Sequence, residues 1–127
     1  MATVKYNLGT VGGMAVTELW SGTTGSLISA VSGVKIALND EFTNYKFLVF
    51  DLCTGYDNGT LKRYYSKVIS VQQIINLINN ADANEHITFT WGFGSYNDCF
   101  EILQDSTTKV LNTNSQYTQC TRIVGLN

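Results

Sequence analysis

The stretch His86-Ile87-Thr88-Phe89-Thr90-Trp91 organises the last third of the chain. Its apolar residues fall on every second position, so Ile87, Phe89 and Trp91 share one face of an extended segment and the polar residues share the other. This alternation predicts a β-strand with one face buried.

Two further strands, separated by a turn, are expected after this stretch. Residues 98–103 form a second extended run, and the turn-forming residues 105–108 separate it from a third run at 109–111. The chain closes with an apolar run at 120–126, which we expect to pair inside a sheet because a free apolar end would expose unpaired amides. We expect four side chains of this region to be buried: Ile87, Phe89, Phe100 and Ile123.

The most apolar run of the sequence is 45–53. On a strand, Phe47 and Val49 point to one face, and three apolar side chains point to the other: Leu48, Phe50 and Leu52. A run that is apolar on both faces is typical of a central strand covered on each side, or of a strand with one face on the core and the other against a second subunit. The sequence therefore predicts a homo-oligomer, with Leu48, Phe50 and Leu52 as candidate interface residues.

The first half of the chain is less regular. Residues 1–16 are interpreted as an N-terminal arm or a short edge strand, and residues 17–20 as a strand closed by a loop at 21–25. A second strand is expected to begin near 26–28. Residues 33–38 alternate cleanly and predict a strand with Val34, Ile36 and Leu38 buried.

Residues 70–79 change the period of the apolar pattern. Val71, Ile74, Ile75 and Ile78 stand at helical spacing, and Ser70 is placed to cap the first turn. A short helix is favoured over a strand.

The whole chain of 127 residues, with 12% aromatic residues and no Pro, thus fits one all-β domain over 17–127. We expect an antiparallel β-sandwich, jelly-roll-like, with at most one short helix.

Composition excludes several classes of protein. The formal net charge is −2 and the basic residues are scattered, with one adjacent pair at Lys62-Arg63, so no surface for nucleic acid is predicted. No apolar run approaches the roughly 20 residues of a membrane span, and the first residues do not resemble a signal peptide. The three cysteines contain no Cys-x-x-Cys pair, which argues against a disulfide framework or a zinc site.

The sequence offers no catalytic constellation. His86, the one histidine, lies on the polar face of its expected strand, and no serine has the Gly-x-Ser-x-Gly setting of a nucleophile. Neither Asp40-Glu41 nor Asp98 with Glu101 has the arrangement of a glycosidase pair. Phosphate-loop and metal-ligand spacings are also absent. We therefore expect no enzyme activity, no metal and no cofactor.

Two polar loops have chemistry suited to sugars. Tyr56, Asp57 and Asn58 lie in one, and Tyr96 and Asn97 lie in the other. Sugar rings stack their C–H faces on aromatic rings, and carboxylates and amides bond their hydroxyls. These five residues are the candidate ligand-binding site, although tyrosine and asparagine are also common in turns for structural reasons.

The order of several motifs resembles the small β-sandwich modules at the distal ends of bacteriophage tail fibres, tailspikes and related virion appendages. The motifs are Glu18-Leu19-Trp20-Ser21-Gly22, Ile36-Ala37-Leu38-Asn39, Asn44-Tyr45-Lys46-Phe47-Leu48-Val49-Phe50, Ile87-Thr88-Phe89 and Thr121-Arg122-Ile123-Val124-Gly125-Leu126-Asn127. The resemblance covers residues 17–127. It implies trimers, attachment to a host surface and no chemistry of the module's own. Such modules usually end a long fibre, so this chain is either a fragment or a separately encoded virion protein.

The resemblance predicts a non-enzymatic virion protein, assembled in the host cytoplasm and carried on a tail fibre or appendage tip. Its expected partners are other copies of itself, other virion proteins and a host-surface glycan or protein, with no nucleic acid and no membrane insertion. Two alternatives remain open. One is a structural virion protein, such as a capsid decoration or fibre-tip cap, and the other is a small soluble lectin.

Overall fold

The computed structural model describes residues 6–82, 86–90, 99–103 and 109–127. The described strands are β1 (Tyr6–Val11), β2 (Met14–Gly25), β3 (Ala30–Ala37), β4 (Phe47–Tyr56), β5 (Leu61–Ser70), β6 (His86–Thr90), β7 (Cys99–Leu103), β8 (Val110–Gln116) and β9 (Thr118–Leu126). The one α-helix of this part of the chain is α1 (Val71–Asn80), and a single 3-10 turn spans Phe42–Asn44.

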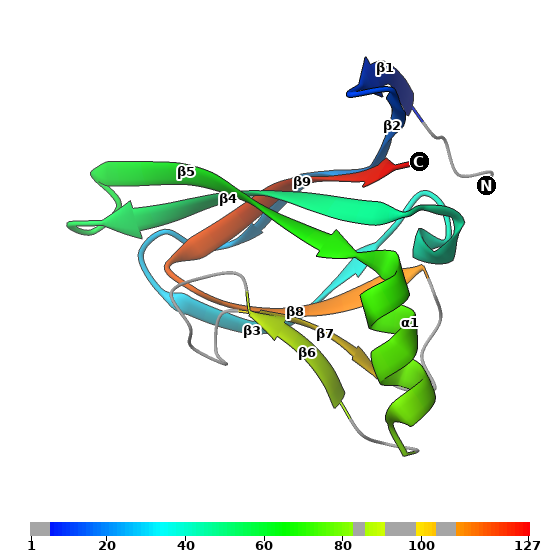
Figure 1. The fold of residues 1–127 in the computed structure, drawn as a ribbon. Coiled ribbons are helices and arrows are strands. Elements are labelled where there is room, and N and C mark those ends of the chain that lie inside the picture. The colour runs from blue at the N-terminus through cyan, green and yellow to red at the C-terminus, as the bar shows by residue number, and fades with distance from the viewer. Residues whose placement is uncertain (1–5, 83–85, 91–98, 104–108) are drawn as a thin grey trace.

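The strands form two stacked antiparallel sheets (Figure 1). One sheet has the order β1-β2-β9-β4-β5 and the other the order β3-β8-β7-β6. The chain changes sheet four times: between β2 and β3, between β3 and β4, between β5 and β6, and between β8 and β9. As a result, β2 pairs with β9 in one sheet and β3 pairs with β8 in the other. The predicted all-β, jelly-roll-like sandwich with one short helix is confirmed.

The central strand of the five-stranded sheet is β4, which pairs with β9 on one side and β5 on the other. Leu48, Phe50 and Leu52 point into the sandwich and are between 0% and 1% exposed. Their assignment to an oligomer interface is therefore wrong, because a partner could reach them only if the two sheets separated. Phe47 and Val49, on the outer face of the same strand, are partly buried.

The last strand lies inside the five-stranded sheet, between β2 and β4, as its apolar sequence predicted. Ile123 is fully buried. Gly125 lies directly under the ring of Tyr45, where any Cβ would overlap the aromatic carbons. The absence of a side chain at this position lets Tyr45 cover the end of β9.

The alternation of residues 86–90 is also confirmed. Ile87 is buried, Phe89 is partly buried against the core, and Thr88 and Thr90 are exposed. The backbone of β7 pairs with β6 and β8, as expected for residues 98–103. The Phe100 side chain, Trp91 and the expected turn at 105–108 lie outside the part that the structure describes.

The helical period at 70–79 predicted α1 correctly. The Ser70 hydroxyl accepts a hydrogen bond from Gln73 N at 3.4 Å, which caps the first turn. Val71 and Ile74 are buried in the core. The helix runs from the end of β5 toward β6 and thereby connects the two sheets at one end of the sandwich (Figure 1).

The expected N-terminal boundaries are partly wrong. β1 is an edge strand, but β2 starts at Met14 and continues through 21–25, which was expected to be a loop. The register of β2 against β9 shifts between Glu18 and Trp20 and again between Ser21 and Thr24, so the small and polar residues of 21–25 accommodate an irregularity within a strand. Residues 26–29 connect β2 to β3, and the strand expected near 26–28 is absent from this described segment. Ile36 and Leu38 are buried, and Val34 is partly buried.

Candidate ligand-binding site at the β4–β5 hairpin

The hairpin turn between β4 and β5 presents two polar side chains of the predicted site. Asp57 and Asn58 have φ of 48° and 56°, a left-handed conformation that Asp and Asn tolerate better than most residues. Gly59 N donates to Tyr56 O at 2.9 Å, and the Thr60 hydroxyl donates to Asp57 O at 2.8 Å. The turn is thus held by its backbone and by Thr60, while Asp57 and Asn58 extend into solvent.

A second corner, between β8 and β9, lies beside this turn. Its single residue, Tyr117, has φ of 61° and a side chain that is 45% exposed. Tyr117 N donates to Ser29 O at 3.3 Å, and Tyr117 O accepts from Gly55 N at 2.8 Å. These two bonds fix the corner between the β2–β3 connection and the end of β4.

The β2–β3 connection reaches the site because β4 carries a glycine there. A Cβ on Gly55 would lie 2.6 Å from Leu27 O and 2.8 Å from Leu27 Cβ, so a larger residue would displace this connection. A Cβ on Gly59 would lie 3.0 Å from Ile28 Cγ2. Close packing on these two glycines brings Leu27 and Ile28 against the hairpin.

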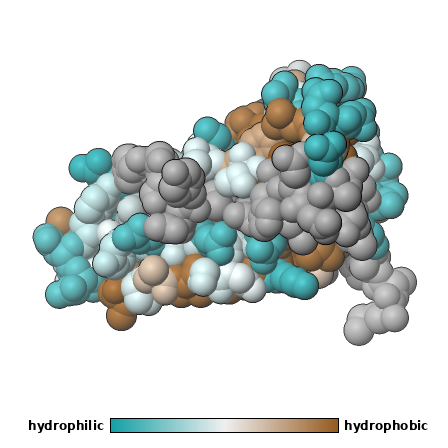
Figure 2. All heavy atoms as spheres, turned by 90° about the horizontal axis from the view of Figure 1, so that it is seen from below, coloured by the Kyte–Doolittle hydropathy of each residue, from teal (hydrophilic) through white to brown (hydrophobic). Residues whose placement is uncertain are grey.

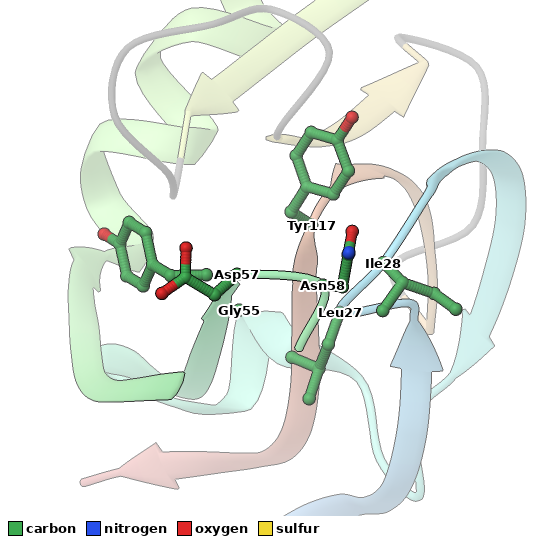
Figure 3. A pocket seen from close by; sticks show the side chains of 7 residues that line it. Leu27, Ile28, Gly55, Asp57, Asn58 and Tyr117 are labelled. Carbon is green, nitrogen blue, oxygen red and sulfur yellow. The ribbon is translucent and has the colours of Figure 1, made fainter. Parts of the chain in front are cut away.

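Together these segments enclose an open pocket of about 440 Å³, within the range of small-ligand sites. It is lined by Leu27, Ile28, residues 55–58 and Tyr117. In the close-up, the Tyr117 and Asn58 side chains point to the same side, with Ile28 beside Asn58 and Asp57 on the opposite side of the view (Figure 3). Seen from below, the hairpin end of the molecule carries hydrophilic and hydrophobic atoms side by side (Figure 2).

The Tyr56 ring lies against an exposed cation on the neighbouring strand. Arg63 Cζ lies 4.9 Å from the centroid of the Tyr56 ring, a cation–π distance. The pocket therefore combines two tyrosines, one carboxylate, one amide and two aliphatic side chains. This set can stack on an apolar ring face and bond hydroxyl groups at its edge, but it has no paired acid and base within the described residues.

A second hollow of about 420 Å³ is lined by the continuation of the same two segments, residues 30–32 and 114–116. Its lining is mainly small and polar. Asn114 Oδ1 accepts a hydrogen bond from Gly33 N at 3.0 Å, which holds β8 to the irregular part of β3. In the β2–β3 connection, Ser29 lies between the residues that line the two hollows, and its carbonyl accepts the bond from Tyr117. Tyr117 itself lines the first hollow and directly follows Gln116 of the second.

The structure brings together three of the five predicted site residues, Tyr56, Asp57 and Asn58. Tyr96 and Asn97 lie outside the described residues. Sequence reasoning missed Tyr117, whose only local signal is its place in a polar run between two strands. It also missed Leu27 and Ile28, because Ile28 was assigned to a strand.

The described residues contain neither a metal-binding cluster nor a membrane-spanning helix. No group of three or more His, Cys, Asp or Glu side chains among the described residues is arranged to hold a metal ion. None of the helices in that part of the chain is long and apolar enough to cross a membrane. In comparisons with known proteins, no protein-family model and no curated protein sequence matched this chain.

Proposed function

We propose that this chain is a non-enzymatic attachment domain that binds a host-surface glycan at the pocket between Tyr56 and Tyr117. The motif order in the sequence suggests that it belongs to a bacteriophage tail fibre, tailspike or related appendage. The sandwich is suited to this role because a rigid pair of sheets holds loops in fixed positions for recognition.

The observation that carries the proposal is the conformation of Tyr117. A bulky residue with positive φ has a strained backbone, and Gly or Asn at the same position would relieve the strain. Backbone strain of this kind clusters at functional sites. Tyr117 is held there by backbone bonds on both sides, and its ring is nearly half exposed at the pocket. A stacking surface for a ligand explains why an aromatic residue occupies this corner.

The polar side chains supply the second half of sugar recognition. The Asp57 carboxylate can accept hydrogen bonds from neighbouring hydroxyl groups, and the Asn58 amide can both donate and accept. The hollow at 30–32 and 114–116 extends the proposed site for a ligand longer than one sugar.

A shallow, open site of this kind binds one glycan weakly, so attachment requires several copies. A homotrimer would raise avidity by roughly 10²–10⁴ without new contacts. The outer face of β4 is the surface we propose for self-association, because Phe47 and Val49 are only partly buried and Val49 pairs with Val68, which is 56% exposed.

The test is binding to a glycan array, followed by titration of the best glycan against matched variants. Tyr117→Asn removes the ring and keeps a residue that tolerates positive φ, and Tyr56→Ala removes the second ring. Each should weaken binding at least tenfold while the melting temperature changes by no more than a few degrees. Tyr64→Ala is the control, since Tyr64 is 76% exposed and does not line the pocket.

Two results would overturn the proposal. One is a chain that binds no glycan on the array and no host cell, which would favour a structural virion protein. The other is that Tyr117→Asn and Tyr56→Ala each bind the glycan as tightly as the parent does, which would place any glycan site elsewhere.

A further inference from the structure

The edge of the five-stranded sheet formed by β5 is long and regular. β5 is the last strand of that sheet, and within the described residues it pairs with β4 only. The pairing runs without a register shift from Phe47 opposite Ser70 to Tyr56 opposite Leu61. The chain also lacks Pro, so neither a bulge nor a proline protects this edge, as they do in many soluble sheets.

Alternate residues of β5 direct their backbone groups to this open edge. On β4, the odd-numbered residues bond toward β9: Gly55 N donates to Tyr117 O, and Asp51 O accepts from the Thr121 hydroxyl. The even-numbered residues of β4 therefore bond to β5. Ser66 lies opposite Asp51, so its N–H and C=O point away from β4 and toward the edge.

The charge of β5 is opposite to that of the rest of the chain. Its ten residues include Lys62, Arg63 and Lys67 and no acidic residue. The net charge of the whole chain is −2, so removing the +3 of β5 leaves −5 on the other residues. Two copies of β5 placed edge to edge would bring six cations together, which disfavours self-pairing and favours an acidic occupant.

The side chains of β5 also offer apolar contacts. Leu61, Tyr64 and Val68 are 58%, 76% and 56% exposed. Tyr64 and Val68 share the outer face of the sheet with Lys62, since they stand two and six positions from it. An added strand would thus meet Lys62, Tyr64 and Val68 on the outer face, and the cations Arg63 and Lys67 on the other face. Its own backbone would complete the hydrogen bonds of the edge.

We propose that β5 accepts an acidic, extended segment of a partner protein as a sixth strand of this sheet. The backbone ladder supplies the affinity, and the basic side chains select an acidic sequence. No residue of β5 lines the glycan pocket, so either of these two proposals can fail without the other. The partner surface shares Val68 with the face proposed for self-association.

The experiment measures fluorescence anisotropy of labelled eight-residue peptides with the full chain. A peptide of alternating Glu and Val should bind at least tenfold more tightly than one of alternating Lys and Val, and its affinity should fall as salt rises. N-methylation of every second amide, which blocks strand pairing, should abolish binding. The two peptides binding equally, or the N-methylated peptide binding as well as its parent, would overturn the proposal.

Variants of the chain separate backbone pairing from charge. Ser66→Pro removes one edge-facing N–H and leaves the bonds to β4, so a folded Ser66→Pro should lose at least tenfold in peptide affinity, with Ser66→Ala as its control. Lys62→Gln with Lys67→Gln should lose a similar amount without altering the backbone. The matched charge control is Lys35→Gln with Lys46→Gln, two exposed lysines outside β5, which should change affinity less than twofold. Equal losses of peptide affinity in the two double variants would show that net charge alone controls binding, and would refute an edge site.

Discussion

The two strands of the β4–β5 hairpin are paired residue by residue over ten positions, yet they differ sharply in burial. β4 has a strand on each side and directs Leu48, Phe50 and Leu52 into the core. Among the described strands, β5 has a neighbour on one side only, and it is exposed at most positions before Ile69. Pairing alone therefore does not bury a strand, because burial requires the second sheet on its face and a further strand at its edge.

The contrast assigns different tasks to the two strands. Of the two strands, β4 is expected to contribute more to stability, since its inner side chains Leu48, Phe50 and Leu52 belong to the buried core cluster. β5 contributes surface chemistry: its Arg63 lies over the Tyr56 ring of the proposed glycan pocket, and its outer edge is the proposed partner site. Substitutions can test this division from the largest expected effect to the smallest.

The largest difference is expected between Phe50 and Tyr64. Phe50 is 0% exposed, so Phe50→Ala should lower the free energy of unfolding by about 3–5 kcal/mol through lost burial and a cavity. Tyr64→Ala should stay within about 0.5 kcal/mol, because the ring is 76% exposed. Urea denaturation of both variants measures the difference. Comparable losses would mean that β5 carries as much of the core as β4.

The same contrast should appear in the response to alkaline pH. The pKa of Tyr45, just before β4, is raised from 10.0 to about 12, because burial disfavours the phenolate and because its hydroxyl donates to Asp40 Oδ2 at 2.9 Å. Unfolding restores the ordinary pKa of Tyr45. The contribution of the protonated Tyr45 hydroxyl to folding stability is therefore fully present below pH 10 and is lost as pH rises toward 12. Two pKa units correspond to at most roughly 2–3 kcal/mol of unfolding free energy, and screening by solvent lowers this figure.

Tyr45→Phe should therefore flatten the fall in stability between pH 10 and 12, as measured by urea denaturation under reducing conditions. Some fall should remain, because burial also raises the pKa of the Cys120 thiol to about 12 from 9.0. The matched variant is Tyr64→Phe, which removes one hydroxyl from a ring that is 76% exposed. An unaltered slope in Tyr45→Phe would show that its phenolate is accommodated in the folded state.

Sequence patterns predicted the regular elements well because each carries its own period. The alternation at 86–90, the apolar end of the chain and the helical spacing after Ser70 all correspond to elements of the fold. The same patterns could not say which apolar face of β4 meets the second sheet, since both faces are apolar. They also wrongly predicted a loop at 21–25, where turn-forming residues lie in an irregularly paired part of β2.

The candidate site was predictable only where its residues are adjacent in sequence. Tyr56, Asp57 and Asn58 form one turn and were found together, because turn chemistry is local. Tyr117, Leu27 and Ile28 join them through contacts between distant segments, above all the backbone bonds of Tyr117 to Ser29 and Gly55. Contacts between segments that are distant in sequence leave no periodic pattern in the sequence.

The smallest effect is expected where β5 ends and α1 begins. Ser70 Oγ accepts a hydrogen bond from Gln73 N, and at 3.4 Å this is a long contact, so Ser70→Ala should cost about 0.5–1 kcal/mol, the low end of the range for a capping residue. Ser66→Ala on the same strand is the control and should cost close to nothing, since Ser66 is exposed and caps no helix. Hydrogen exchange should locate the loss in the first turn of α1. A cost above about 2 kcal/mol, spread over the whole domain, would instead show that Ser70 holds the helix against both sheets, and that the end of β5 belongs with the stabilising part of the hairpin.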